Sequence, residues 1–245
     1  MKKLFVFPLA LAMAMALSLG LMSPAQAAVA PPNPVMIAAV TLGDSTLTSS
    51  TSVQTPVRLT ASAVPGTGSW YAYGDVYVNG NLVLQDQMIG SYQNADFSLF
   101  WPKAAGFGSI QVVNVRVTAY SASTNYADSW STSKQPLPGA SNVAPVRRGI
   151  DQSAYFTIIK KGKSKATVTA YNWRMYQPDG SQASLKKVRL QRHVKGKWKN
   201  FKWVKVNAAG KGTLKFKQSK KYKYRIVIPT TASLLGGMTQ GTRKI

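Results

Sequence analysis

Few residues in this chain could carry acid–base or nucleophilic chemistry. It has a single histidine, His193, no cysteine and no glutamate, and its seven acidic residues are all aspartates. General acid–base catalysis needs a group that titrates near neutral pH, or a carboxylate pair with separated pKa values. His193 follows Arg192 beside a predicted hairpin turn, where a surface histidine is the simpler interpretation. The sequence therefore predicts a protein that is not an enzyme.

The acidic residues are dispersed along the chain and form no Asp-x-Asp cluster: Asp44, Asp75, Asp86, Asp96, Asp128, Asp151 and Asp179. Calcium and magnesium sites need several oxygen ligands close together. The absence of cysteine excludes thiolate metal sites and disulfide bonds. We expect no metal site and no cofactor.

The strongest chemical signal is the uneven distribution of positive charge. Residues 28–142 carry four Lys and Arg against five Asp, whereas residues 143–245 carry 25 Lys and Arg against two Asp. An ordinary soluble surface mixes both signs. A segment of one sign raises the local concentration of molecules of the opposite charge, so we expect the second half to bind polyanions.

Strand-like alternation places the basic residues of the second half opposite apolar ones. In 212–217 (GTLKFK) and 222–226 (YKYRI), the apolar side chains share one face and the basic side chains the other. The predicted polyanion-binding residues are Lys187, Arg189, Lys202, Lys205, Lys215, Lys217, Lys223 and Arg225. Lysine predominates, which favours diffuse attraction over bidentate phosphate recognition. The alternative is that the lysines only keep strand edges from pairing.

Aromatic residues add a candidate stacking function. Inward Val204 and Val206 would turn Trp203 outward, and a bulge near Phe201 is needed if Trp198 anchors the core. In the first half we expect a loop with exposed aromatics that could stack on sugars or bases, namely Trp70, Tyr71 and Tyr73. The alternative is that these rings fold over the end of a sandwich.

The short alternating runs, separated by turn residues, predict an all-β fold of two tandem immunoglobulin-like β-sandwich domains. We place them at residues 40–133, near neutral, and 150–245, strongly basic. The proline-containing segment 134–149 is the predicted linker, and it coincides with the change in charge. Asn79-Gly80 predicts a type I′ hairpin turn. A transmembrane barrel is disfavoured because lysines would meet lipid.

Residues 1–27 have the pattern of a secretory signal peptide. Lys2 and Lys3 precede an apolar stretch that ends at the A-x-A site Ala25-Gln26-Ala27. A membrane anchor is the alternative, because the stretch approaches spanning length. An Ala/Pro-rich spacer, 28–39, follows. We therefore expect a secreted protein, with loose association with the cell surface.

Part of the second half resembles a known family. Leu190-Gln191-Arg192, Trp198 and Tyr224-Arg225 lie in a run that resembles repeats of secreted actinobacterial proteins, described as bacterial immunoglobulin-like domains. The resemblance covers roughly residues 150–245. It implies a sandwich fold and no activity, because such domains serve as spacers, adhesive modules and wall-associated units alike.

These patterns predict a non-enzymatic binding or adhesion module for anionic cell-envelope polymers. An anionic cell-wall polymer or acidic polysaccharide is the first candidate ligand, and non-specific nucleic acid or anionic lipid are others. No helical pattern or zinc-ligand set favours sequence-specific DNA recognition. Two alternatives remain open: a structural or protein-interaction envelope module whose charge is only a surface property, and a basic antimicrobial or toxin-like protein.

Overall fold

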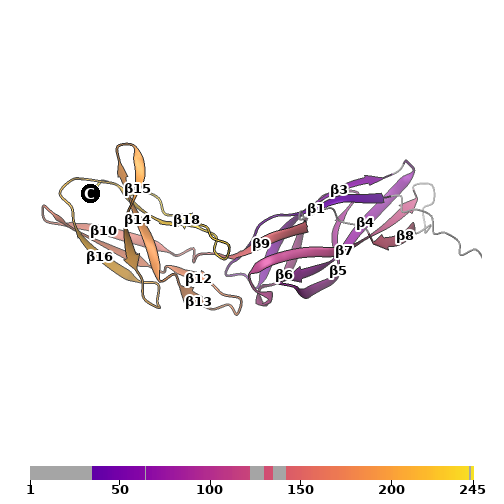
Figure 1. Cartoon of the computed structure of the whole chain (residues 1–245), viewed down its shortest axis with the longest axis horizontal. Coiled ribbons are helices and arrows are strands. Elements are labelled where there is room, and N and C mark those ends of the chain that lie inside the picture. The colour runs from indigo at the N-terminus through magenta and orange to yellow at the C-terminus, as the bar shows by residue number, and fades with distance from the viewer. Residues whose placement is uncertain (1–34, 64, 122–129, 135–141, 243) are drawn as a thin grey trace, which may run out of the picture. The chain divides into compact units, whose positions relative to one another are not determined.

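The computed structural model describes residues 35–63, 65–121, 130–134, 142–242 and 244–245. Every named element in these residues is a strand except the short 3-10 helix η1 (Lys103–Ala105). The strands form several sheets (Figure 1), so the chain is all-β and consistent with the β-sandwich class. Their inward side chains make two hydrophobic cores. The predicted signal peptide lies outside the described residues. No helix among the described residues has the length and apolarity to cross a membrane.

Two sheets surround the first core. One has the order β1 (Val35–Leu42), β3 (Ser52–Ala63), β6 (Asp96–Pro102). The other has the order β2 (Ser45–Leu47), β9 (Val143–Arg148), β7 (Gly108–Ser121), β4 (Thr67–Val78), β5 (Asn81–Ser91), and β8 (Trp130–Lys134) also pairs with β7. The β2–β9 pair is parallel and the other named pairs of these sheets are antiparallel.

The first core follows from alternation along these strands. In β3 every second residue from Val53 to Leu59 is buried. The only polar position in that series, Thr55, is satisfied: its Oγ1 lies 2.6 Å from Ser45 Oγ and accepts a hydrogen bond of 2.8 Å from Trp101 Nε1. All three side chains are buried, so this bond network ties β2, β3 and β6 together inside the core.

The turn predicted at Asn79-Gly80 is present between β4 and β5. Asn79 has φ 52° and Gly80 has φ 80°, the left-handed values that a type I′ turn requires at both positions. The Asn79 side chain also donates to the Phe107 carbonyl and accepts from the Ser109 N–H. The residue thus fixes the turn to the start of β7.

Part of the predicted linker is a strand of the first group of sheets. Residues 143–148 form β9, which pairs with β7 and, in parallel, with β2. Ala144 and Val146 are buried in the first core. The prolines and the lack of a long alternating pattern predicted a linker here. The prediction is wrong for residues 143–148, because a strand this short needs only two inward side chains to join the sheet.

Two further sheets surround the second core. We call the first the threonine sheet, in the order β10 (Tyr155–Lys161), β11 (Lys165–Tyr171), β16 (Gly212–Lys217). The second, which we call the tryptophan sheet, has the order β15 (Lys197–Lys205), β14 (Lys187–Val194), β17 (Tyr224–Ile228), β18 (Gly237–Met238). A separate pair is formed by β12 (Arg174–Tyr176) and β13 (Gln182–Ser184).

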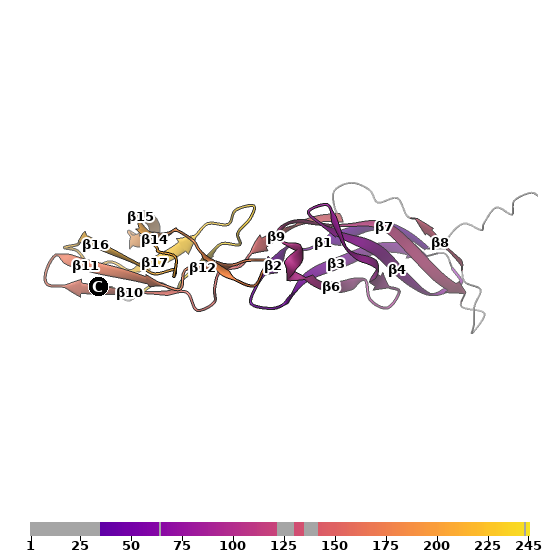
Figure 2. The ribbon, with the colours of Figure 1, turned by 90° about the horizontal axis from the view of Figure 1, so that it is seen from below.

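Inward residues of both sheets make the second core. Val168 of the threonine sheet and Leu190 and Ile226 of the tryptophan sheet are fully buried in it. Figure 2 shows β10 and β11 side by side, with β14 and β17 in the neighbouring layer. Each sheet therefore has one face on the core and one outer face.

The bulge expected near Phe201 is present, but Trp198 is not a core anchor. Leu190 pairs with Lys202 and Gln191 with Asn200, which leaves Phe201 as the extra residue of β15. The Phe201 ring packs against Phe216, with ring centroids 5.1 Å apart. The bulge turns Phe201 to the core and Trp198 to the outer face of the tryptophan sheet, because one additional residue shifts the alternation.

Candidate anion-binding faces

The structure distributes the eight predicted polyanion-binding residues over different surfaces. Lys215 and Lys217 are exposed on the outer face of the threonine sheet, whereas Lys187, Arg189, Lys205 and Arg225 lie on the outer face of the tryptophan sheet. The two sheets share one core, so these faces point in opposite directions. The remaining two, Lys202 at the bulge and Lys223 just before β17, are exposed beside the tryptophan sheet. All eight are at least partly exposed, but they lie on separate surfaces, and Lys202 stands opposite the buried Leu190 rather than on the outer face.

Cations cover the exposed indole of the tryptophan sheet. The Arg189 guanidinium carbon lies 3.7 Å from the centre of the Trp203 ring, and Lys187 Nζ lies 4.8 Å from it. Trp203 is 38% exposed. Both contacts are cation–π interactions within the usual range. The protein's own cations therefore occupy part of the ring surface that a ligand would need.

Arg225 is held by its neighbours on the same sheet. Its Nε donates to Gln191 Oε1 at 2.9 Å, and its guanidinium lies 4.5 Å from the centre of the Trp198 ring. Gln191 in turn donates to Asn200 Oδ1 at 2.9 Å. These contacts hold the Arg225 side chain along the sheet, so its guanidinium is already bound by residues of the protein itself.

The threonine sheet gathers lysines that the sequence pattern did not assign. The register places Lys161, Lys165 and Lys217 directly opposite one another on three adjacent strands. Lys215 lies opposite Thr167 in the row two residues along. The lysines line a hollow of about 450 Å³ whose floor includes Ala166 and Phe216. Lys161 and Lys165 are not among the predicted binding residues, and only the strand register shows that they meet Lys217.

No carboxylate of the described residues is paired with the lysines of this face. The strands of the threonine sheet contain no acidic residue. Asp151 accepts from Ser153 and from Arg174, and Asp179 accepts from the Ser181 N–H. Although burial alone raises the pKa of Asp151, these hydrogen bonds hold it below its ordinary value. Both acidic residues of this half therefore have hydrogen-bond donors away from the lysines of the threonine sheet.

The aromatic group predicted as a loop is part of β4. Trp70 is buried in the first core, while Tyr71 and Tyr73 are half-buried on the opposite face of the strand. Tyr71 packs edge-on against Tyr120, with ring centroids 6.2 Å apart. Burial raises the pKa of Tyr73, and nearby Tyr120, Tyr71 and Asp86 raise it further. Glycines on both sides suggested a loop, but Trp70 and Ala72 alternate inward as in any half-buried strand.

The single histidine lies on the tryptophan sheet. His193 is opposite Trp198, and the two rings make an edge contact with centroids 5.1 Å apart. Its backbone N–H donates to the Lys223 carbonyl at 2.9 Å. In the described part of the chain, no three His, Cys, Asp or Glu side chains are grouped so that they could hold a metal ion.

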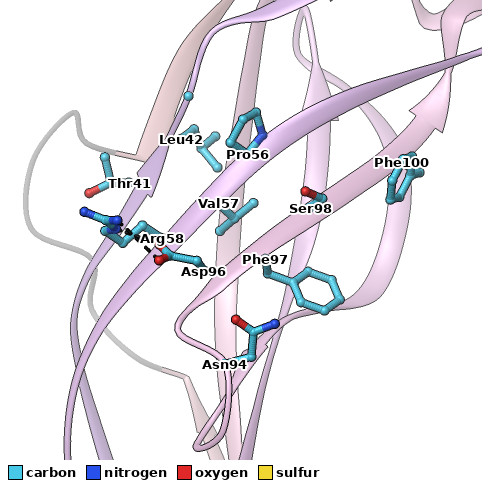
Figure 3. A pocket seen from close by; sticks show the side chains of 11 residues that line it. Thr41, Leu42, Pro56, Val57, Arg58, Asn94, Asp96, Phe97, Ser98 and Phe100 are labelled. Carbon is cyan, nitrogen blue, oxygen red and sulfur yellow. Dashed lines mark hydrogen bonds and ion pairs between the residues drawn. The ribbon is translucent and has the colours of Figure 1, made fainter.

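The first group of sheets contains the larger hollow, about 750 Å³, on the outer face of β3 and β6 (Figure 3). Its charges are paired, because Arg58 Nε donates to Asp96 Oδ1 at 2.6 Å. Phe97 and Phe100 supply apolar lining, and Phe100 is 60% exposed. This hollow offers no free positive charge to an anion, whereas the threonine sheet does.

The protein is all-β and consistent with the β-sandwich class, and the sheets of its second half have cationic outer faces. In sequence comparisons the chain matches no protein-family model and no curated protein.

Proposed function

We propose that the protein is a secreted, non-enzymatic adhesion module that binds anionic polymers of the cell envelope through its basic second half. The observation that carries the proposal is the set of outward lysines and arginines of two sheets with no acidic residue among them. Repulsion among like charges in such a segment lowers the stability of the fold, and a bound ligand of opposite charge would relieve it. A polyanion is such a ligand.

The proposed architecture is two tandem immunoglobulin-like sandwiches, with the first acting as a spacer or weak recognition module. Two separate cores support this arrangement. The resemblance of residues 150–245 to actinobacterial immunoglobulin-like repeats supports the sandwich architecture, while such domains serve as spacers, adhesive modules and wall-associated units alike. Secretion is proposed from the leader, which has basic residues before an apolar stretch and an A-x-A site.

Binding of this kind depends on salt. Exposed charges interact over about 8 Å at physiological ionic strength. Each phosphate that a cation neutralises adds nearly one unit to the slope of log affinity against log salt. Several lysines acting together on one polymer therefore give steep salt dependence, even where each contact is weak.

The test is co-sedimentation of residues 28–245 with purified cell walls across a salt series, before and after removal of the anionic wall polymers. Binding that needs those polymers and falls steeply between low and physiological salt supports the proposal. Binding that ignores both changes, or no binding, contradicts it and favours a protein partner. Leakage of dye from anionic but not neutral vesicles would instead favour a membrane-active basic protein.

A further inference from the structure

We infer that the outer face of the threonine sheet binds a linear anionic polysaccharide, with lysines at one end of the face and stacked tyrosines at the other. This inference deepens the proposed function and rests on it. It selects one face of the second half and one class of polymer, a glycan rather than a nucleic acid or lipid.

The cationic end is built by register. Lys161, Lys165 and Lys217 stand in one row, and Lys215 stands on the same side of β16 two residues away. The four side chains surround the hollow of about 450 Å³, and each is exposed. Lysine ammonium groups are compact and hydrated, which suits carboxylate or phosphate groups whose positions vary along a polymer.

Hydroxyl groups occupy the middle of the face. Thr157, Thr169 and Thr213 lie opposite one another on the three strands. The next row, between them and the lysines, has Thr167 between Lys215 and Ile159, whose side chain is 58% exposed. On each strand the threonine side chains point to the same outer face as the lysines. A hydroxyl donates one hydrogen bond and accepts others, so this row matches the hydroxyl groups of sugar rings.

Two tyrosines close the other end. Tyr155 and Tyr171 are paired across β10 and β11 with their rings stacked, the centroids 4.7 Å apart and the planes 11° apart. Tyr155 is 49% exposed. Lys211 Nζ lies 5.5 Å from the centre of the Tyr171 ring. Tyr155, exposed and held by stacking on the half-buried Tyr171, offers a rigid apolar surface with a polar tip, which suits the apolar face of a sugar.

The spacing fits an extended chain. Tyr171 and Lys165 are six residues apart on β11, which is about 20 Å along a strand. A bare polyphosphate would use the lysines but not the threonines or tyrosines between and beyond them. The tryptophan sheet is less suited, because two cations, Arg189 and Lys187, lie over its exposed Trp203. On the threonine sheet one cation, Lys211, lies near Tyr171, and among the described residues none lies over the exposed Tyr155.

The first experiment measures the affinity of residues 28–245 for alginate oligosaccharides, a polyuronate probe, by titration calorimetry. The variant K161Q/K165Q/K215Q/K217Q removes the cationic end. The control K195Q/K197Q/K199Q/K221Q removes the same charge from exposed positions outside the threonine sheet. We expect at least about tenfold weaker binding in the first variant and less than about threefold in the control. Equal losses would overturn the choice of face.

The second experiment separates sugar stacking from charge. Tyr155→Ala should weaken alginate binding about two- to tenfold and leave polyphosphate binding unchanged, while Tyr155→Phe should retain the alginate affinity. Circular dichroism and thermal unfolding check that each variant is folded. Equal effects on both polymers, no effect of Tyr155→Ala, or tighter binding of single-stranded DNA than of alginate would overturn the inference. Wild-type protein that sediments with walls while showing any of these results would leave the proposed function intact.

Discussion

Arg189 and Trp203 face each other across β14 and β15, with the guanidinium carbon 3.7 Å from the centre of the indole ring. The pair exists because the bulge at Phe201 keeps Trp203 on the outer face beside Arg189. Lys187 approaches the same ring at 4.8 Å. The contact fastens the edge strand β15 to β14 from outside, opposite to the core contacts of Val188 and Val204.

We predict a measurable coupling between these two residues. Exposed cation–π pairs contribute about 0.5–1 kcal/mol. A double-mutant cycle with Arg189→Gln and Trp203→Ala, measured by urea unfolding, should therefore give a coupling free energy of about that size. A coupling free energy indistinguishable from zero would mean that the Arg189–Trp203 contact does not stabilise the fold.

Neighbouring residues of β16 should differ sharply in their effect on stability. Phe216 is buried against Phe201 and Tyr224, so Phe216→Ala should lower the free energy of unfolding by about 3–5 kcal/mol. Lys215→Ala and Lys217→Ala should change it by less than about 0.5 kcal/mol, because both side chains are exposed. Chemical denaturation of the three variants measures the contrast, and similar values for all three would contradict the observed alternation.

The buried bond network of the first core gives a third prediction. Thr55→Val keeps the shape of the side chain but removes the acceptor of Trp101 Nε1 and the partner of Ser45 Oγ. Buried groups left without partners cost about 1–3 kcal/mol. Thr55→Ser, which retains the hydroxyl, should recover most of the loss in thermal or urea unfolding. Equal destabilisation by both substitutions would assign the effect to packing instead.

Acid should weaken the fold through Asp75. This carboxyl is 6% exposed, and burial alone raises its pKa. Hydrogen bonds from the Asp86 N–H, Asn114 and Arg116 outweigh burial and hold the pKa below its ordinary value. The ionised Asp75 therefore contributes fully to the free energy of unfolding above about pH 4, the pKa of this group in the unfolded chain. This stabilisation is lost as the pH falls through the lower pKa of the folded protein.

The measurement is the free energy of urea unfolding at several pH values below about 5. Wild-type stability should decline with falling pH, and Asp75→Asn should decline less steeply. At neutral pH the variant should be less stable by about 1–3 kcal/mol, because the Arg116 guanidinium loses a charged partner. Parallel pH profiles would show that Asp75 does not titrate as described.

Local patterns predicted much of this fold. Alternation identified the inward faces of β16 and β17, and the dipeptide Asn79-Gly80 identified the hairpin between β4 and β5. The bulge near Phe201 is present, but the premise on which it was expected is wrong, because Trp198 lies on the outer face and does not anchor the core. Each of these features depends on residues close together in sequence, where side-chain period and backbone preference act directly.

Features that depend on distant residues were not predictable from the sequence. Residues 143–148 resembled a linker because their partners, β7 and β2, lie far away in the chain. The row formed by Lys161, Lys165 and Lys217 depends on the register of three strands, one of them about 50 residues further along the sequence. Burial of Trp70 likewise required a second sheet on which to pack.

The bulge in β15 also gives the protein an intrinsic optical reporter. Trp198 and Trp203 are five residues apart, so a regular strand would place their indoles on opposite faces, yet both lie on the outer face of the tryptophan sheet. Trp70, Trp101 and Trp173 are buried in the cores. Unlabelled protein should therefore change its fluorescence emission when a ligand covers the tryptophan sheet, and keep it nearly constant when a ligand occupies the threonine sheet.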